Sequence, residues 1–220
     1  MTGHDDFAFE PIPGLPERPP AGEDVLWQGH PSAFALARDA FKIYWIAAYF
    51  AALTLWRAQS AFAEGGLGKA IAVALPHLAL GAVVCCVVWL LAYAQARACI
   101  YTITTSRVVM RIGAALSVTF NYPFAQIAAA KLDLHKSGTG TIALETLGTT
   151  KISYLVAWPH VRPWHFTKTQ PALRSISDAA RVARVLSDAA DHRLSLPVIA
   201  RKDAADTAVD AATAKNGAMQ

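Results

Sequence analysis

The most distinctive pattern in this chain is a stretch of 27 residues without a charged side chain, from Ala70 to Ala96. As an α-helix it would be about 40 Å long, which exceeds the roughly 30 Å hydrocarbon core of a bilayer. Soon after Arg97, residues 99–104 bring the β-branched and aromatic alternation of a strand. The pattern predicts a folded module mounted directly on a membrane helix.

A shorter apolar segment precedes this stretch. It begins near Ile43 and is predominantly apolar as far as Trp56. To cross a bilayer it must extend to near Ala63, which places Arg57 within it. The long stem of an arginine can carry its charge out to the headgroups. A turn-like loop at residues 64–69 would join the two segments, so residues 38–97 are predicted to form a two-helix transmembrane hairpin.

Small residues recur on both apolar segments, which is how membrane helices approach one another closely. The first strip is Ala47, Ala48, Ala51 and Ala52, and the second is Ala74, His77, Gly81 and Cys85. The strips could meet each other or a helix of another protein. The remaining cysteine, Cys99, stands at the border of the long apolar stretch, and membrane packing accounts for Cys85 and Cys86.

Positive charge near the segment ends predicts the orientation, because cytoplasmic flanks are rich in Lys and Arg. One side holds Arg38, Lys42, Arg97, Arg107 and Arg111, and the other holds Arg57 and Lys69. Both termini are therefore expected in the cytoplasm. No cleavable signal peptide is expected, since the N-terminus lacks a basic region followed by an apolar one.

The part after the membrane predicts a strand-rich domain over residues 98–195. Strands are expected near 99–104, 107–112, 116–121, 129–135, 139–145, 150–157 and 164–167. An amphipathic helix beginning near Ser175 or Ser177 would follow, with Ser177 as its N-cap. The predicted fold class is α+β: a transmembrane hairpin followed by a seven-stranded barrel that the C-terminal helix caps.

The remaining segments are shorter. Residues 1–22 are rich in proline and acidic side chains, which predicts a flexible lead, and residues 196–220 lack apolar periodicity, which predicts a disordered tail. Residues 23–37 could add a strand to the later sheet. The net charge of +4 is divided: residues 1–36 hold six acids and one Arg, whereas residues 97–170 hold eight Lys or Arg and two acids. The basic part could contact anionic headgroups or an acidic partner protein, or its charge could simply reflect the orientation of the chain in the membrane.

Several motifs carry a family resemblance. The hairpin from Tyr101 to Gly113 resembles bacterial pleckstrin-homology-like (PH-like) domains that follow membrane helices. The whole chain is more similar still to the PuhB family of photosynthetic complex assembly proteins. Three further pieces occur in the expected order: the lead Glu10–Pro16, the box Gly22–Gly29 and the run Trp158–Trp164.

The resemblance implies a non-enzymatic factor of the bacterial inner (intracytoplasmic) membrane that assists assembly of the photosynthetic reaction centre and its core antenna. It implies those subunits and the lipid bilayer as partners, with a homodimer left open and no nucleic acid. It carries across no catalytic residue, metal or cofactor. The alternative is a PH-like, lipid-sensing membrane adaptor of another pathway.

His77 is the candidate pigment ligand, because a histidine in a membrane segment could bind the magnesium of a chlorophyll. Antenna polypeptides typically place Ala four residues earlier, whereas this chain has Val73. Helix packing is the simpler interpretation.

The run Trp158–His165 is the densest polar and aromatic cluster. It offers only His160 and His165 as metal ligands. A structural turn and a recognition surface are the other two interpretations, and the second makes Trp158, His160, Arg162 and Trp164 candidate partner contacts.

Arg107 and Arg111 would lie on one face of a strand close to the membrane, where they could contact lipid phosphate or form a plain solvated flank. For catalysis, we find no nucleophile elbow, phosphate loop, carboxylate cluster or metal-spaced His and Cys pattern. The sequence therefore predicts no enzyme.

Overall fold

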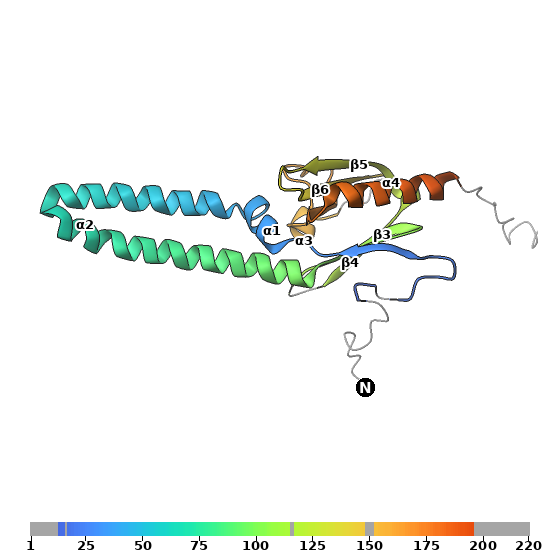
Figure 1. Ribbon diagram of the computed structural model, residues 1–220, viewed down its shortest axis with the longest axis horizontal. Helices are drawn as coiled ribbons and strands as arrows, with labels where there is room; N and C mark the ends of the chain where they lie inside the picture. The colour runs from blue at the N-terminus through green and yellow to red at the C-terminus, as the bar shows by residue number, and fades with distance from the viewer. Residues whose placement is uncertain (1–12, 16, 115–116, 148–151, 196–220) are drawn as a thin grey trace, which may run out of the picture.

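The computed structural model describes residues 13–15, 17–114, 117–147 and 152–195. The predicted lead lies mostly outside these residues, and the predicted tail at 196–220 lies wholly outside them. The long helical element α2 (Ile43–Ala98) projects from one end of a domain built from two β-sheets and a C-terminal helix (Figure 1). Both ends of α2 therefore connect to the same end of the folded domain.

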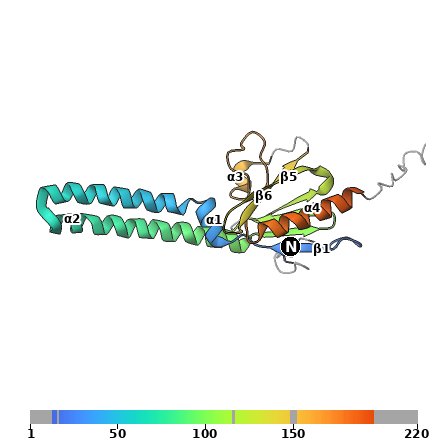
Figure 2. The same cartoon turned by 45° about the horizontal axis from the view of Figure 1, so that its top comes forward.

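The helical element α2 replaces the two separate helices that the sequence predicts. Its helical conformation breaks only at Gly65 (φ −158°, ψ 20°) and Gly66 (φ 71°, ψ −164°). The positive φ of Gly66 is readily adopted only by glycine. The chain reverses there, and the two arms of α2 lie side by side in both views (Figures 1 and 2). Among the described residues, α2 is the one helix long and apolar enough to cross a membrane.

The buried positions of α2 carry small side chains: Thr54, Ala61, Ala70, Gly81, Ala92 and Ala96. The arms pack closely at Gly81, where an added Cβ would lie 2.8 Å from the Cβ of Phe50 on the other arm. Small residues therefore allow the close packing of the arms.

The two predicted small-residue strips have different outcomes. The second strip, centred on Gly81, is buried or half-buried, whereas all four alanines of the first strip are exposed. The first arm turns Phe50 and Thr54 toward its partner instead. Small residues on several faces of a helix do not reveal which face packs.

The first sheet has four antiparallel strands in sequential order: β1 (Val25–Gly29), β2 (Ile100–Thr104), β3 (Arg107–Ile112) and β4 (Val118–Pro123). As the sequence suggested, the segment after the lead adds a strand, because β1 pairs with β2 and Trp27 lies opposite Ile103. The strands predicted at residues 99–104 and 107–112 correspond to β2 and β3.

The second sheet has three strands, β5 (Ile127–Leu134), β6 (Gly140–Thr146) and β7 (Ala172–Ile176). The strands predicted at 150–157 and 164–167 are wrong: the described residues there form a short helix, α3 (Tyr154–Ala157), and a loop. A short apolar run does not distinguish a strand from a helix. The sequence missed β7, whose apolar run is interrupted by Arg174.

The seven strands form two sheets rather than the closed barrel that the sequence predicts. Among the described residues, an isolated β-bridge between Pro31 and Ile176 links the segment after β1 to β7. The helix α4 (Ala179–Ser195) packs against both sheets and buries Ala179, Val182, Leu186 and Ala189 in their shared core. Its N-terminal boundary differs from the prediction, because Asp178 rather than Ser177 immediately precedes it.

The short helix α1 (Ala33–Asp39) joins the domain to α2. Its N-cap Ser32 accepts a hydrogen bond from the backbone N–H of Ala35. The helix packs against both α2 and β7, and Leu36 is fully buried. The base of α2 is therefore held by packing as well as by chain continuity.

We predict that Gly81→Leu separates the arms of α2. The new side chain would overlap Phe50, and overpacking of this kind costs about 1–3 kcal/mol. The apparent melting temperature of the purified protein in detergent should fall. Gly68→Leu is the matched control, because an added Cβ at Gly68 meets nothing within 4 Å; an equal fall in both variants would contradict close packing at Gly81.

Candidate functional site

The most chemically distinctive cluster lies where α2 enters the first sheet. Cys99 directly follows α2, Tyr101 lies on β2, and His160 follows α3; all three are buried. The His160 ring contacts the Cys99 Sγ through Nε2 at 3.0 Å and the Tyr101 hydroxyl through Nδ1. The cluster thus brings together residues about 60 positions apart in the chain.

One arrangement of protons gives every group in the cluster a suitable role. The Tyr101 hydroxyl accepts a bond from the backbone N–H of Arg174 at 3.3 Å, so its own proton is directed to Nδ1 of His160. The Nε2–H of a neutral imidazole then donates to Cys99. Burial, assisted by the charge of Arg174, lowers the pKa of His160 to about 3, so the ring is neutral at physiological pH.

A contact between a thiol and an imidazole resembles a nucleophilic pair, but the environment opposes that chemistry. Burial raises the pKa of the Cys99 thiol to about 11, and nucleophilic cysteines need a lowered value. The cluster is suited to fastening the end of α2 to the domain. His160, which the sequence offered as a candidate partner contact, has a side chain that is only 1% exposed.

The basic strand face that the sequence predicts is partly used inside the molecule. The Arg107 guanidinium donates two hydrogen bonds of 2.8 Å to the carboxylate of Glu23, whose side chain is 8% exposed. Thr104 also donates to this carboxylate. Arg107 is therefore occupied by the chain segment before β1, while Arg111 lies opposite Ile100 at the end of β3 nearer α2.

The other candidate contacts lie on the connection from β6 to β7. Trp158 packs edge-on against Phe41, just before α2, with ring centroids 5.0 Å apart. Arg162 donates to the side-chain oxygen of Gln170, and Trp164 is 83% exposed. The rings of Trp164 and Phe166 lie 6.2 Å apart, and Phe166 also contacts Tyr154, which adjoins Leu155 in the chain. We use the name aromatic surface for Trp164 and Phe166 together with Leu155, all three mostly exposed. Sequence reasoning missed Leu155 and Phe166.

His77, the candidate pigment ligand, lies in the second arm of α2. Its Nδ1 donates to the carbonyl oxygen of Val73 at 2.8 Å, one turn earlier, so the ring is oriented by its own helix. Pigment ligation remains a prediction. In the described part of the chain, no group of three or more His, Cys, Asp or Glu side chains is placed to hold a metal ion.

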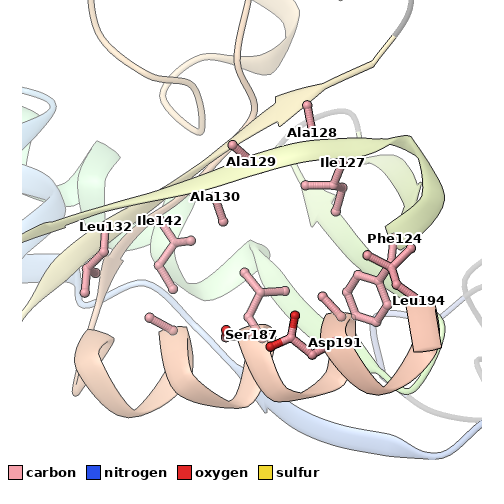
Figure 3. A pocket seen from close by; sticks show the side chains of 13 residues that line it. Phe124, Ile127, Ala128, Ala129, Ala130, Leu132, Ile142, Ser187, Asp191 and Leu194 are labelled. Atoms are coloured by element: carbon pink, nitrogen blue, oxygen red, sulfur yellow. The ribbon is translucent and has the colours of Figure 1, made fainter.

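Two cavities flank the second sheet. An apolar groove of about 280 Å³ separates β5 from α4. Figure 3 shows Ala130 and Ile142 pointing toward the helix, where Ser187 and Asp191 face them. A polar pocket of about 460 Å³ lies beside the base of α2 and is lined by Lys42, Arg162 and Arg174 among others.

We expect the buried histidine to make folding pH-dependent. Because the pKa of His160 is lower in the folded protein than its ordinary 6.5, the unfolded chain binds the additional proton as the pH falls below 6.5. The free energy of unfolding therefore does not depend on His160 above about pH 6.5, and between pH 6.5 and pH 3 it decreases by up to about 1.4 kcal/mol per pH unit. Melting curves of His160→Gln should show a weaker pH dependence, whereas exposed His192→Gln should follow the wild type.

The Glu23–Arg107 pair predicts a different acid dependence. Burial opposes ionisation of Glu23, but hydrogen bonds from Arg107 and Thr104 outweigh it and lower its pKa below 4.5. The stabilisation is therefore present above pH 4.5 and is lost as the pH falls through the folded-state value. Glu23→Gln should cost about 1–2 kcal/mol at pH 7. Chemical denaturation should show this difference shrinking in acid; a similar loss in Asp24→Asn would contradict the assignment.

Comparison with known proteins agrees with this architecture. Residues 41–190, from the base of α2 into α4, match the bacterial PH domain family. A protein of Rhodobacter capsulatus, described as an uncharacterized 23.7 kDa protein in the puhA 5′ region, is 48% identical over 201 residues. The match covers 90% of this chain and 94% of the relative. No solved structure matches. The chain therefore belongs to the bacterial PH domain family.

Proposed function

We propose that this protein is a non-enzymatic assembly factor of the bacterial inner membrane that acts on the photosynthetic reaction centre and its core antenna. The observation that carries the proposal is the relative encoded in the 5′ region of puhA, a reaction-centre gene. Identity of 48% over nearly the full length supports a shared role. The resemblance of the motifs to the PuhB family points to the same process.

In this proposal α2 crosses the membrane twice and leaves both termini in the cytoplasm. Its first arm, residues 43–64, is about 33 Å long, and its second arm, residues 67–98, is about 48 Å long. Either length can cross a hydrocarbon core of about 30 Å. Arg38, Lys42 and Arg97 at the base favour the cytoplasmic side.

Aromatic side chains support the same placement. Trp45 near the start of the first arm and Trp89 near the end of the second are both exposed. Trp and Tyr are enriched where a bilayer meets water, so these side chains would mark one interface. The folded domain would then rest directly on the cytoplasmic surface of the membrane.

The aromatic surface is our candidate contact for a reaction-centre or antenna subunit. Leu155 and Trp164 are 85% and 83% exposed, and the neighbouring Trp158 packs on Phe41 at the base of α2. Large apolar side chains grouped on a surface mark interaction sites, and Trp is frequent at interface hot spots. The surface lies where the cytoplasmic face of a membrane-bound subunit would be within reach.

We assign this protein no reaction. The thiol–imidazole pair of Cys99 and His160 is buried, and its thiol is held protonated. This supports a structural role for the most reactive residue types in the folded domain. Assistance to assembly requires binding and release of subunits, without a covalent step.

Affinity purification of the full-length protein from mildly solubilised membranes should recover reaction-centre or core antenna subunits. The double variant Leu155→Ser/Trp164→Ser should reduce that recovery severalfold, because it removes the two most exposed apolar side chains of the aromatic surface. Leu194→Ser, at an exposed site on α4, should recover subunits like the wild type. Recovery of no subunit, together with normal complex levels in a deletion strain, would contradict the assembly role.

A further inference from the structure

The polar pocket beside α2 has a composition that the assembly role does not explain. Lys42 precedes the first residue of α2, Asp39 ends α1, and the opposite wall comes from β5, β6 and the loop at residues 162–165. Four cations line the pocket: Lys42, Lys131, Arg162 and Arg174. Asp39 and Asp133 are the carboxylates of the lining, and Lys131 also pairs with Glu145 at 3.4 Å. Lys42, Arg162 and Arg174 thus carry more positive charge than the two lining carboxylates offset.

Arg174 is the most informative of these residues. Its side chain comes from β7, is 6% exposed, and donates to the backbone carbonyl oxygens of Pro159 and Asp39, each at 3.2 Å. Its Nε is buried and has no hydrogen-bond partner among the described residues. A buried guanidinium normally has an anionic partner, because withdrawal of its charge from water is costly.

The nearby acids do not supply that partner fully. The carboxylate of Asp39 is bonded by Arg38 at 2.7 Å and lies 3.8 Å from His135. Burial lowers the pKa of Arg174 even though the charges of Asp39 and Asp133 act in the opposite direction. The other walls add donors, since the Arg162 side chain is oriented by Gln170 and Lys42 lies at the rim.

We propose that this pocket binds the phosphate group of an anionic membrane lipid. Arg162 and Lys42 would contact the phosphate oxygens, and the field of Arg174 would favour negative charge deeper in the pocket. Arginine and lysine are the residues that bind phosphate most readily. A lipid headgroup with a single net negative charge would therefore be sufficient. The site is distinct from the strand face of Arg107, which Glu23 occupies.

The position of the pocket selects a lipid rather than a free phosphate as its source. Lys42 adjoins Ile43, where the first arm of α2 begins, so the pocket lies within a few residues of the apolar surface. Headgroups around the base of α2 would be present at high local concentration. This inference goes beyond the assembly role and rests only on α2 lying in a bilayer, so loss of subunit recovery would not affect it.

The test uses the full-length protein in a mild detergent and native mass spectrometry. Dioleoylphosphatidylglycerol, dioleoylphosphatidylcholine and inorganic phosphate are titrated separately. We expect one phosphatidylglycerol to bind about tenfold or more tightly than phosphatidylcholine, because the choline cation meets the basic lining. Millimolar inorganic phosphate should compete only weakly.

The variant Lys42→Gln/Arg162→Gln should lose that preference by about tenfold, since two charge-assisted contacts are removed. The control Arg181→Gln/Arg184→Gln removes the same charge from the exposed face of α4 and should bind phosphatidylglycerol within about twofold of the wild type. Lys131→Gln is a milder second variant should the first fold poorly. Equal binding of both lipids, equal loss in the control, or stronger binding of inorganic phosphate would each overturn the proposal.

Discussion

The buried polar contacts at the base of α2 hold this molecule together. Cys99 directly follows α2, Tyr101 lies on β2 of the first sheet, His160 follows α3, and Arg174 lies on β7 of the second sheet. Arg174 also reaches the last residue of α1 through a backbone carbonyl. Because polar groups removed from water must find partners, each of these elements limits where the others can lie. The orientation of the domain on α2 follows from this constraint.

The open arrangement of the two sheets depends on the same junction and on α4. The bridge at Pro31 joins the sheets near α1, and α4 fills much of the space between them with Val182 and Leu186. A helix can complete such a core because its apolar face buries area without requiring backbone hydrogen bonds from a sheet edge. The groove beside β5 is what remains beyond that packing.

The distribution of charge has two different consequences. The acidic segment before β1 is used within the molecule, where Glu23 engages Arg107. Near α2, by contrast, cations gather around a pocket in which Arg174 is only partly compensated. The aromatic surface lies on the same connection as Arg162. The end of the domain nearest the apolar helix therefore combines the charge and the apolar area from which both proposals derive.

Sequence alone determined the features that depend on local pattern. The long apolar element, the hairpin of β2 and β3, the added strand β1 and the apolar face of α4 all follow from periodicity along a single segment. Less of the candidate site could be predicted from the sequence. Trp164 and Arg162 were identified as residue types suited to recognition, but the residues that surround them were not predicted. The helix α3 escaped prediction because a short apolar run has no distinctive period, and β7 because Arg174 interrupts its apolar pattern.

Only the tertiary structure decided which distant residues meet. Glu23 and Arg107 are 84 positions apart, and no local signal joins them. The sequence left His160 open between a structural turn, a recognition surface and a metal site, whereas the fold buries it against Tyr101 and Cys99. The alanines of the first arm are exposed, while Phe50 lies against Gly81 of the partner arm and Thr54 is buried. Hydrophobic periodicity specifies that a segment has a face to bury, whereas packing and hydrogen bonding between segments decide what that face meets.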